Sequence, residues 1–158
     1  MRAMDNLGVD LGFLLETKLT GGIYTRFSSG YNVLASKALL PWQGGIALFW
    51  RGNNSYEIKE TQIWGSNIIS LHLIVGSTQF FVVGCYIPPS DLATLTCVEV
   101  AWRKCPAGAH PILVSNLNLD LCACTQSKRR QLLSRWMPWN WSTCPDTSIN
   151  AGGNGRGG

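Results

Sequence analysis

The sequence has few of the side chains that most catalytic and metal sites need. It contains two histidines, His72 and His110, and nine acidic residues, of which only Asp120 and Asp146 lie beyond Glu99. A metal-dependent enzyme would therefore have few carboxylates to draw on in the second half of the chain. Charged residues make up 14% of the sequence and hydrophobic residues 46%, a balance that excludes intrinsic disorder and predicts a globular fold.

Long hydrophobic runs are also absent. The apolar stretches are far shorter than the ~18–20 residues that cross a bilayer, and no apolar core follows Met1–Asp5 as it would in a secretory signal. We therefore expect no membrane partner and an intracellular location. The 158 residues amount to one domain or part of one, and the net charge of +4 is compatible with nucleic-acid binding but too small to demonstrate it.

The six cysteines are predicted to be mostly buried free thiols, because an intracellular protein does not use a disulfide framework. Cys122-Ala-Cys124 together with Cys144 is a weak candidate for a zinc site. It lacks the two-residue spacing within each cysteine pair, and no histidine lies nearby.

The segment Pro111–Leu121 changes from apolar to polar residues halfway along. Ile112-Leu-Val114 is typical of a strand that is buried on both faces. If the run stays extended, Asn116, Asn118 and Asp120 share one face, as in the floor of a polar site.

Several strands are expected before this run. Closely spaced turn residues separate the middle ones, so we predict an antiparallel meander from Gly44 to Ile87. The strand-like segments are a buried one at Asp10–Glu16, then Gly30–Ala35, Ile46–Arg51, Tyr56–Trp64, Ile68–Val75 and Gln79–Ile87.

A strand–helix–strand unit should follow the meander. Pro88-Pro89 ends the last strand, and Ser90 or Asp91 can cap a helix whose apolar residues have helical spacing. The strand at Pro111 would then run parallel to the strand that ends at Tyr86. Open α/β sheets place their ligands at such strand ends, so we expect Glu16, Tyr86 and Asn116 to meet in one crevice.

The last segment differs in composition. Ser127–Met137 is predicted to be a helix, and the glycine-rich end, Ala151–Gly158, is predicted to be disordered. Lys128-Arg-Arg130 is either the solvated face of that helix or a nucleic-acid contact, with tryptophans as stacking surfaces: Trp136, Trp139 and Trp141.

Four short motifs occur in order along the chain: Glu16-Thr-Lys18, Gly44-Gly-Ile-Ala-Leu48, Val83-Gly-Cys-Tyr-Ile-Pro-Pro-Ser90 and Val114-Ser-Asn-Leu-Asn118. Together they resemble the endonuclease/exonuclease/phosphatase superfamily, and most closely the apurinic-type endonuclease domain of non-LTR (LINE-like) retrotransposons. The resemblance covers about residues 4–121. It implies an α/β fold, a two-sheet α/β/β/α sandwich, that cuts DNA with a divalent metal, usually Mg²⁺; a nuclear location would suit that partner.

The resemblance also implies roles for individual residues. Glu16 matches the metal-binding glutamate, Tyr86 the tyrosine that contacts the scissile phosphate, and Asn118 the asparagine that orients it. Asn116 stands where the family has the aspartate that serves the attacking water. On the residues alone, Glu16 is a strand-end acid, Tyr86 could equally be a core tyrosine, and the two asparagines could be turn formers.

The departures from the family pattern are large. Asn116 replaces the aspartate, Ser115 a glycine and Leu15 a glutamine, and no candidate follows for the terminal Ser-Asp-His motif. His72 is expected to be a half-exposed sheet residue, not a catalytic one. The expected fold is therefore a copy truncated at both ends, with binding of Mg²⁺ by this chain in doubt.

These observations predict a partial domain at residues 1–125 and a divergent basic, tryptophan-rich segment at 126–158. The first functional hypothesis is a degenerate, inactive metal-dependent DNA endonuclease. The alternatives are a non-enzymatic nucleic-acid-binding fragment and a relic without a function. An incomplete sandwich would also leave part of a sheet uncovered, which predicts self-association.

Overall fold

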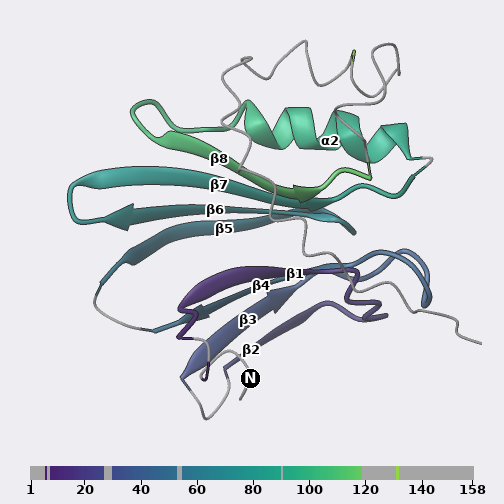
Figure 1. The fold of residues 1–158 in the computed structure, drawn as a ribbon, viewed down its shortest axis with the longest axis horizontal. Coiled ribbons are helices and arrows are strands. Elements are labelled where there is room, and N and C mark those ends of the chain that lie inside the picture. Colours follow the sequence, from purple (N-terminus) through teal and green to yellow (C-terminus); the bar gives the residue numbers. More distant parts are fainter. Residues whose placement is uncertain are drawn as a thin grey trace, which may run out of the picture.

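The computed structural model describes residues 6, 8–26, 30–52, 55–89, 91–118 and 131. In these residues two four-stranded sheets stack face to face, and a helix covers the outer face of the second sheet (Figure 1). The predicted two-sheet α/β sandwich is confirmed; of its outer helical layers, the described residues contain this one. The predictions for Asp120, the Cys122–Cys144 set and almost all of the 126–158 segment lie outside the described residues.

The first sheet is antiparallel throughout, in the order β1-β4-β3-β2. Its strands are β1 (Leu11–Leu15), β2 (Ile23–Arg26), β3 (Tyr31–Ala35) and β4 (Ile46–Arg51). β1 was predicted to be buried, but its residues are half-buried or exposed because it lies at the edge of the sheet. β2, a short strand after Gly21-Gly22, was not predicted.

The second sheet has the order β5-β6-β7-β8. Its strands are β5 (Glu57–Gly65), β6 (Ile68–Val75), β7 (Thr78–Tyr86) and β8 (His110–Asn116). The helix α2 (Leu92–Trp102) connects β7 to β8, and these two strands are parallel, as predicted. Asp91 begins the helix, because its carboxylate accepts a hydrogen bond of 2.9 Å from the Thr94 N–H.

The predicted meander is wrong at its first strand. β4 does not pair with β5; it lies between β1 and β3 in the other sheet. The residues Ile46–Phe49 are buried, as expected of a central strand with neighbours on both sides. β4 and β5 therefore belong to different sheets, and the Tyr56 hydroxyl donates a 2.7 Å hydrogen bond to the Arg51 carbonyl at the end of β4.

β8 also differs from its prediction as a strand buried on both faces. Ile112 and Val114 are each 40% exposed, because β8 is the edge strand of its sheet. The extended conformation ends at Asn116, and Asn118 has a φ of 46°. Asn116 and Asn118 therefore do not follow each other along one strand face, as the sequence pattern suggested.

Two clusters of apolar side chains hold the layers together. The first lies between the sheets, and burial of each large side chain contributes roughly 1.5–3 kcal/mol. It contains Ile46, Leu48, Ile69, Leu71, Leu73 and Val82. The second lies between α2 and the second sheet and includes Ile68, Phe81, Val83, Cys85, Leu95 and Val98.

The described cysteines are free, but not all are buried as predicted. Cys85 is buried, Cys105 is half-buried and Cys97 is exposed. Burial raises the pKa of the Cys85 thiol to about 12, so this thiol stays protonated and unreactive near neutral pH. None of the described helices has the length and apolar composition needed to cross a membrane.

Candidate active site

Glu16 is the first residue after β1, and the backbone on both sides of it is fixed. β1 pairs with β4 up to Leu15, and the N–H groups of Thr17 and Lys18 then donate to the Gly45 and Gly44 carbonyls, at 3.2 and 2.9 Å. Glu16 itself has a φ of 56°, a left-handed conformation that is uncommon for a residue with a side chain. Strained residues of this kind concentrate at functional sites.

The Glu16 carboxylate meets Tyr86, the last residue of β7. The Tyr86 hydroxyl donates a short hydrogen bond to Glu16 Oε1, across 70 positions of sequence. This bond, burial and the negative charge of Glu16 raise the pKa of Tyr86 above its ordinary value, while hydrogen bonds from the side chains of Gln43 and Asn118 oppose the shift. Tyr86 is therefore a neutral hydrogen-bond donor near neutral pH.

Asn116 lies beside Tyr86, because the parallel register of β7 and β8 makes these two residues neighbours. The backbone continues this pairing, since the Ile87 N–H donates to the Asn116 carbonyl at 3.0 Å. The Asn116 side-chain oxygen accepts a 3.0 Å hydrogen bond from the Asn118 N–H, which closes a tight turn. The Asn118 amide nitrogen in turn donates to the Ile87 carbonyl at 2.8 Å. The structure thus brings Glu16, Tyr86, Asn116 and Asn118 together.

Gln43 belongs to the same cluster and was not predicted. It lies immediately before Gly44-Gly45, at the end of a turn in which its N–H donates to the Leu40 carbonyl at 3.2 Å. Its only sequence signal was its place beside two glycines, both of which have positive φ. Its contact with Tyr86 depends on how this turn folds back towards β7, which a local pattern does not encode.

A magnesium ion is the cofactor that the family resemblance implies, and the residues at this site do not fit one. Mg²⁺ is held by hard oxygen ligands, carboxylates above all. Among the described residues no group of three or more His, Cys, Asp or Glu side chains could hold a metal ion. Glu16 is the one carboxylate in the cluster, and its oxygen already accepts from Tyr86. The Asn116 oxygen is likewise engaged in its turn.

A pocket of about 330 Å³ lies next to the cluster. Gln43 belongs to both, since its side chain lines the pocket and opposes the rise in the pKa of Tyr86. Asn67 lines the pocket as well, and its carbonyl accepts a 3.0 Å hydrogen bond from the Tyr86 N–H. The remaining lining residues are Leu39, Leu40, Gly44, Pro88 and Asp91.

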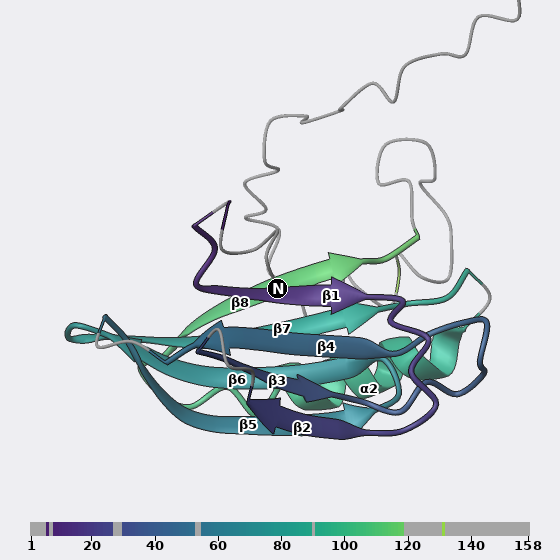
Figure 2. The same cartoon turned by 90° about the horizontal axis from the view of Figure 1, so that it is seen from below.

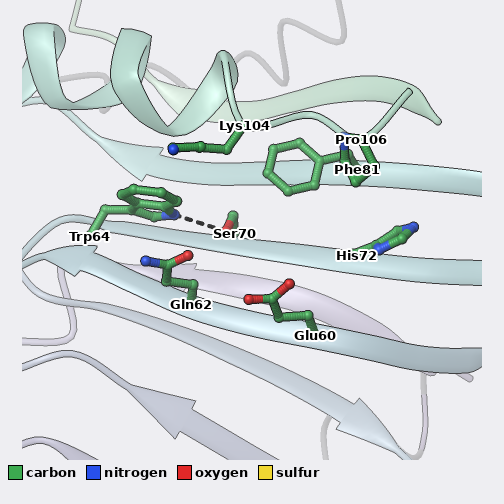
Figure 3. A pocket seen from close by; sticks show the side chains of 8 residues that line it. All are labelled: Glu60, Gln62, Trp64, Ser70, His72, Phe81, Lys104 and Pro106. Carbon is green, nitrogen blue, oxygen red and sulfur yellow. Dashed lines mark hydrogen bonds between the residues drawn. The ribbon is translucent and has the colours of Figure 1, made fainter. Parts of the chain in front are cut away.

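Neither histidine belongs to the cluster. His72 lies on the face of β6 that also carries Ser70, opposite the face that packs against the first sheet. It bonds to Gln79 at 3.1 Å and lines a separate hollow of about 50 Å³ with Glu60, Trp64 and Lys104 (Figure 3). His110 is exposed at the start of β8, with its ring 5.8 Å from that of Phe80.

The chain's sequence matches no family profile and no curated protein. Its structure is similar to the crystal structure of D. rerio TDP2 humanised by 14 mutations, with a TM-score of 0.52 and 10% sequence identity. The match covers 85% of this chain and 59% of that one, so the chain spans about three fifths of the length of TDP2. At this identity the similarity concerns the fold alone. The chain shares the two-sheet α/β sandwich fold of this TDP2 structure.

Proposed function

We propose that this chain is a nuclease-type domain of the kind carried by non-LTR retrotransposons, and that it binds nucleic acid without cutting it. Two independent observations support the nuclease type: the four motifs in order along the sequence, and the sandwich fold. The loss of cutting is proposed from the chemistry of the clustered residues.

The observation that carries the proposal is the chemistry and hydrogen bonding of the Asn116 side chain. It lies beside Tyr86, at the position where the family resemblance requires a carboxylate that takes a proton from water. An amide cannot take that proton, and the Asn116 oxygen already accepts the Asn118 N–H. General-base assistance alone is worth about 10²–10⁴ in rate, so its loss is a severe defect.

The same cluster is suited to binding. Neutral amide side chains adjoin it, since Gln43 and Asn67 both line the pocket next to the cluster. Two exposed lysines, Lys18 and Lys37, lie in the segments that follow β1 and β3, and both can contact phosphate groups. These groups can hold a nucleic-acid strand and supply no chemistry that breaks it.

The first experiment measures nicking of a supercoiled plasmid in the presence of Mg²⁺. We expect no nicking by the wild-type chain and none by the Asn116→Asp variant. Residues of one catalytic unit act together, so restoring a single carboxylate recovers little activity. Nicking by the wild-type chain that disappears in Glu16→Ala and with a chelator would show an active nuclease and contradict the proposal.

A binding measurement separates the proposal from a relic without function. We expect the affinity for a short DNA to fall linearly with the logarithm of the salt concentration, because lysine contacts with phosphates release counterions. A Lys18→Gln, Lys37→Gln variant should show a shallower slope. Absence of binding even at low salt would favour the relic.

A further inference from the structure

The pocket beside Tyr86 is bordered by a turn, residues 39–43, that exposes large apolar side chains. Leu39, Leu40 and Gln43 line the pocket, and Leu39 is 76% exposed; Trp42, in the same turn but outside the lining, is 67% exposed. Exposed apolar groups that adjoin a cavity mark surfaces that bind a ligand. We refer to this segment as the Trp42 turn.

The Trp42 turn is held in place at both of its ends. Before it, the Ala38 N–H donates to the Leu19 carbonyl at 2.6 Å; after it, the Lys18 N–H donates to the Gly44 carbonyl at 2.9 Å. Within it, the Gln43 N–H donates to the Leu40 carbonyl. A flat aromatic side chain on a fixed turn binds a partner with little loss of conformational entropy.

The charges around the pocket decide which part of a ligand it accepts. None of the residues that line it is a cation, and Asp91 contributes a carboxylate. A phosphate group would therefore be repelled from the interior. Lys37, which is exposed, lies two positions before Leu39, outside the lining but close enough in sequence to contact a phosphate at the rim.

The pocket also offers hydrogen bonds to a neutral, planar group. Asn67 is 6% exposed and its side-chain oxygen accepts the Gly45 N–H at 2.9 Å, whereas its amide nitrogen has no partner within the described part of the chain. Gln43 contributes a second amide to the lining. Amides of this kind pair with the edge of a nucleobase.

We propose that this pocket binds one unpaired nucleobase, stacked on Trp42 and bonded through Gln43 and Asn67, with the adjoining phosphate held at Lys37. The volume of about 330 Å³ suits a group of that size. The proposal rests on the proposed function, since it specifies which part of a nucleic acid the same site takes. It makes binding dependent on bases as well as on charge.

The test compares two fluorescently labelled single strands of equal length, one an oligothymidine and the other carrying abasic sugars throughout. Both have the same phosphates. Stacking of one base on an aromatic side chain should make the wild-type chain bind the oligothymidine about 5- to 150-fold more tightly. Trp42→Ala should remove most of this preference, and Trp42→Phe should retain part of it because a smaller ring still stacks.

Two matched variants separate stacking from charge. Lys37→Gln should weaken binding of both strands by the same factor, because it removes a phosphate contact. Val100→Ala removes another exposed apolar group, on α2 and outside the pocket lining, and should change neither affinity. Circular dichroism would establish that each variant is folded.

The outcomes distinguish this inference from the function on which it rests. Equal affinity of the wild-type chain for both strands would overturn the base pocket and leave nucleic-acid binding intact. An unchanged preference in Trp42→Ala would also overturn it. Failure to bind either strand at low salt would overturn both the pocket and the proposed function.

Discussion

At the scale of single residues, the bond between Tyr86 and Glu16 controls the protonation of the site. The pKa of Tyr86 lies above its ordinary value of 10.0, first because its hydroxyl donates to Glu16. The stability that this contact contributes is therefore complete below pH 10 and is lost as the pH rises through the raised pKa of the folded state.

We expect Glu16→Gln to lower the pKa of Tyr86, because the variant removes a charge that opposes the phenolate. Ultraviolet absorbance titration measures this, with Tyr86→Phe subtracted to isolate the one tyrosine. The free energy of unfolding should therefore fall less between neutral and high pH in Glu16→Gln than in the wild-type chain. Superimposable titrations of the wild-type and Glu16→Gln chains would contradict the assigned hydrogen bond.

The sequence predicted part of this cluster. The residue that it missed, Gln43, was missed for a physical reason. Glu16, Tyr86 and Asn116 were expected in one crevice because each ends a strand, and strand ends meet at a sheet edge. Gln43 ends no strand. It reaches Tyr86 through a turn whose ends are bonded to the residues after β1, a long-range arrangement that composition and spacing do not reveal.

At the scale of elements, the packing of β1 on β7 holds Glu16 over its partner. A methyl group added at Gly84 would lie 2.3 Å from ring atoms of Phe13, closer than real contacts allow. We expect Gly84→Ala to lower the free energy of unfolding by about 1–3 kcal/mol, as overpacking does, measured by urea denaturation.

The control for this prediction is Gly21→Ala, where nothing lies within 4 Å of the added methyl group. It should change stability little. Combining Gly84→Ala with Phe13→Leu should recover part of the loss, because the smaller side chain vacates the space. A loss that Phe13→Leu does not relieve would point to backbone strain in β7 instead of contact with β1.

The elements from β5 to β8 were predicted well, whereas the partners of β4 in the first sheet were not. β5, β6 and β7 follow one another and pair in sequence, and α2 has its own cap in Asp91. β4 was assigned to the wrong sheet because Gly52-Asn-Asn54 has the composition of a hairpin turn. The burial of Ile46–Phe49 and the pairing of β4 with β1 and β3 place β4 in the first sheet instead.

At the scale of the whole molecule, both sheets have an edge on the same side. β1 and β8 form these two edges, one in each sheet (Figure 2). Leu14, Ile112 and Val114 are exposed on these two strands. Edge strands with exposed apolar groups can pair with another chain, so we expect concentration-dependent association through this side.

Val114→Lys should reduce that association, because a lysine on an edge strand opposes pairing, and it should cost little stability at an exposed site. Sedimentation velocity over a range of concentrations measures the effect. Val75→Lys, an exposed apolar residue of β6 on an inner strand, is the matched control. A monomer at every concentration would contradict the role assigned to this side.

The place of β4 between β1 and β3 also has a consequence for the order in which the chain folds. The β5–β6–β7 meander closes through short turns, whereas Leu11 must find Trp50, and Glu16 must find Tyr86, across long stretches of chain. Closing long loops before their contacts form is slow. We expect β1, although it precedes the other strands of the two sheets in sequence, to be the last of them to dock, so that Glu16 reaches Tyr86 only after the rest of the sandwich has formed.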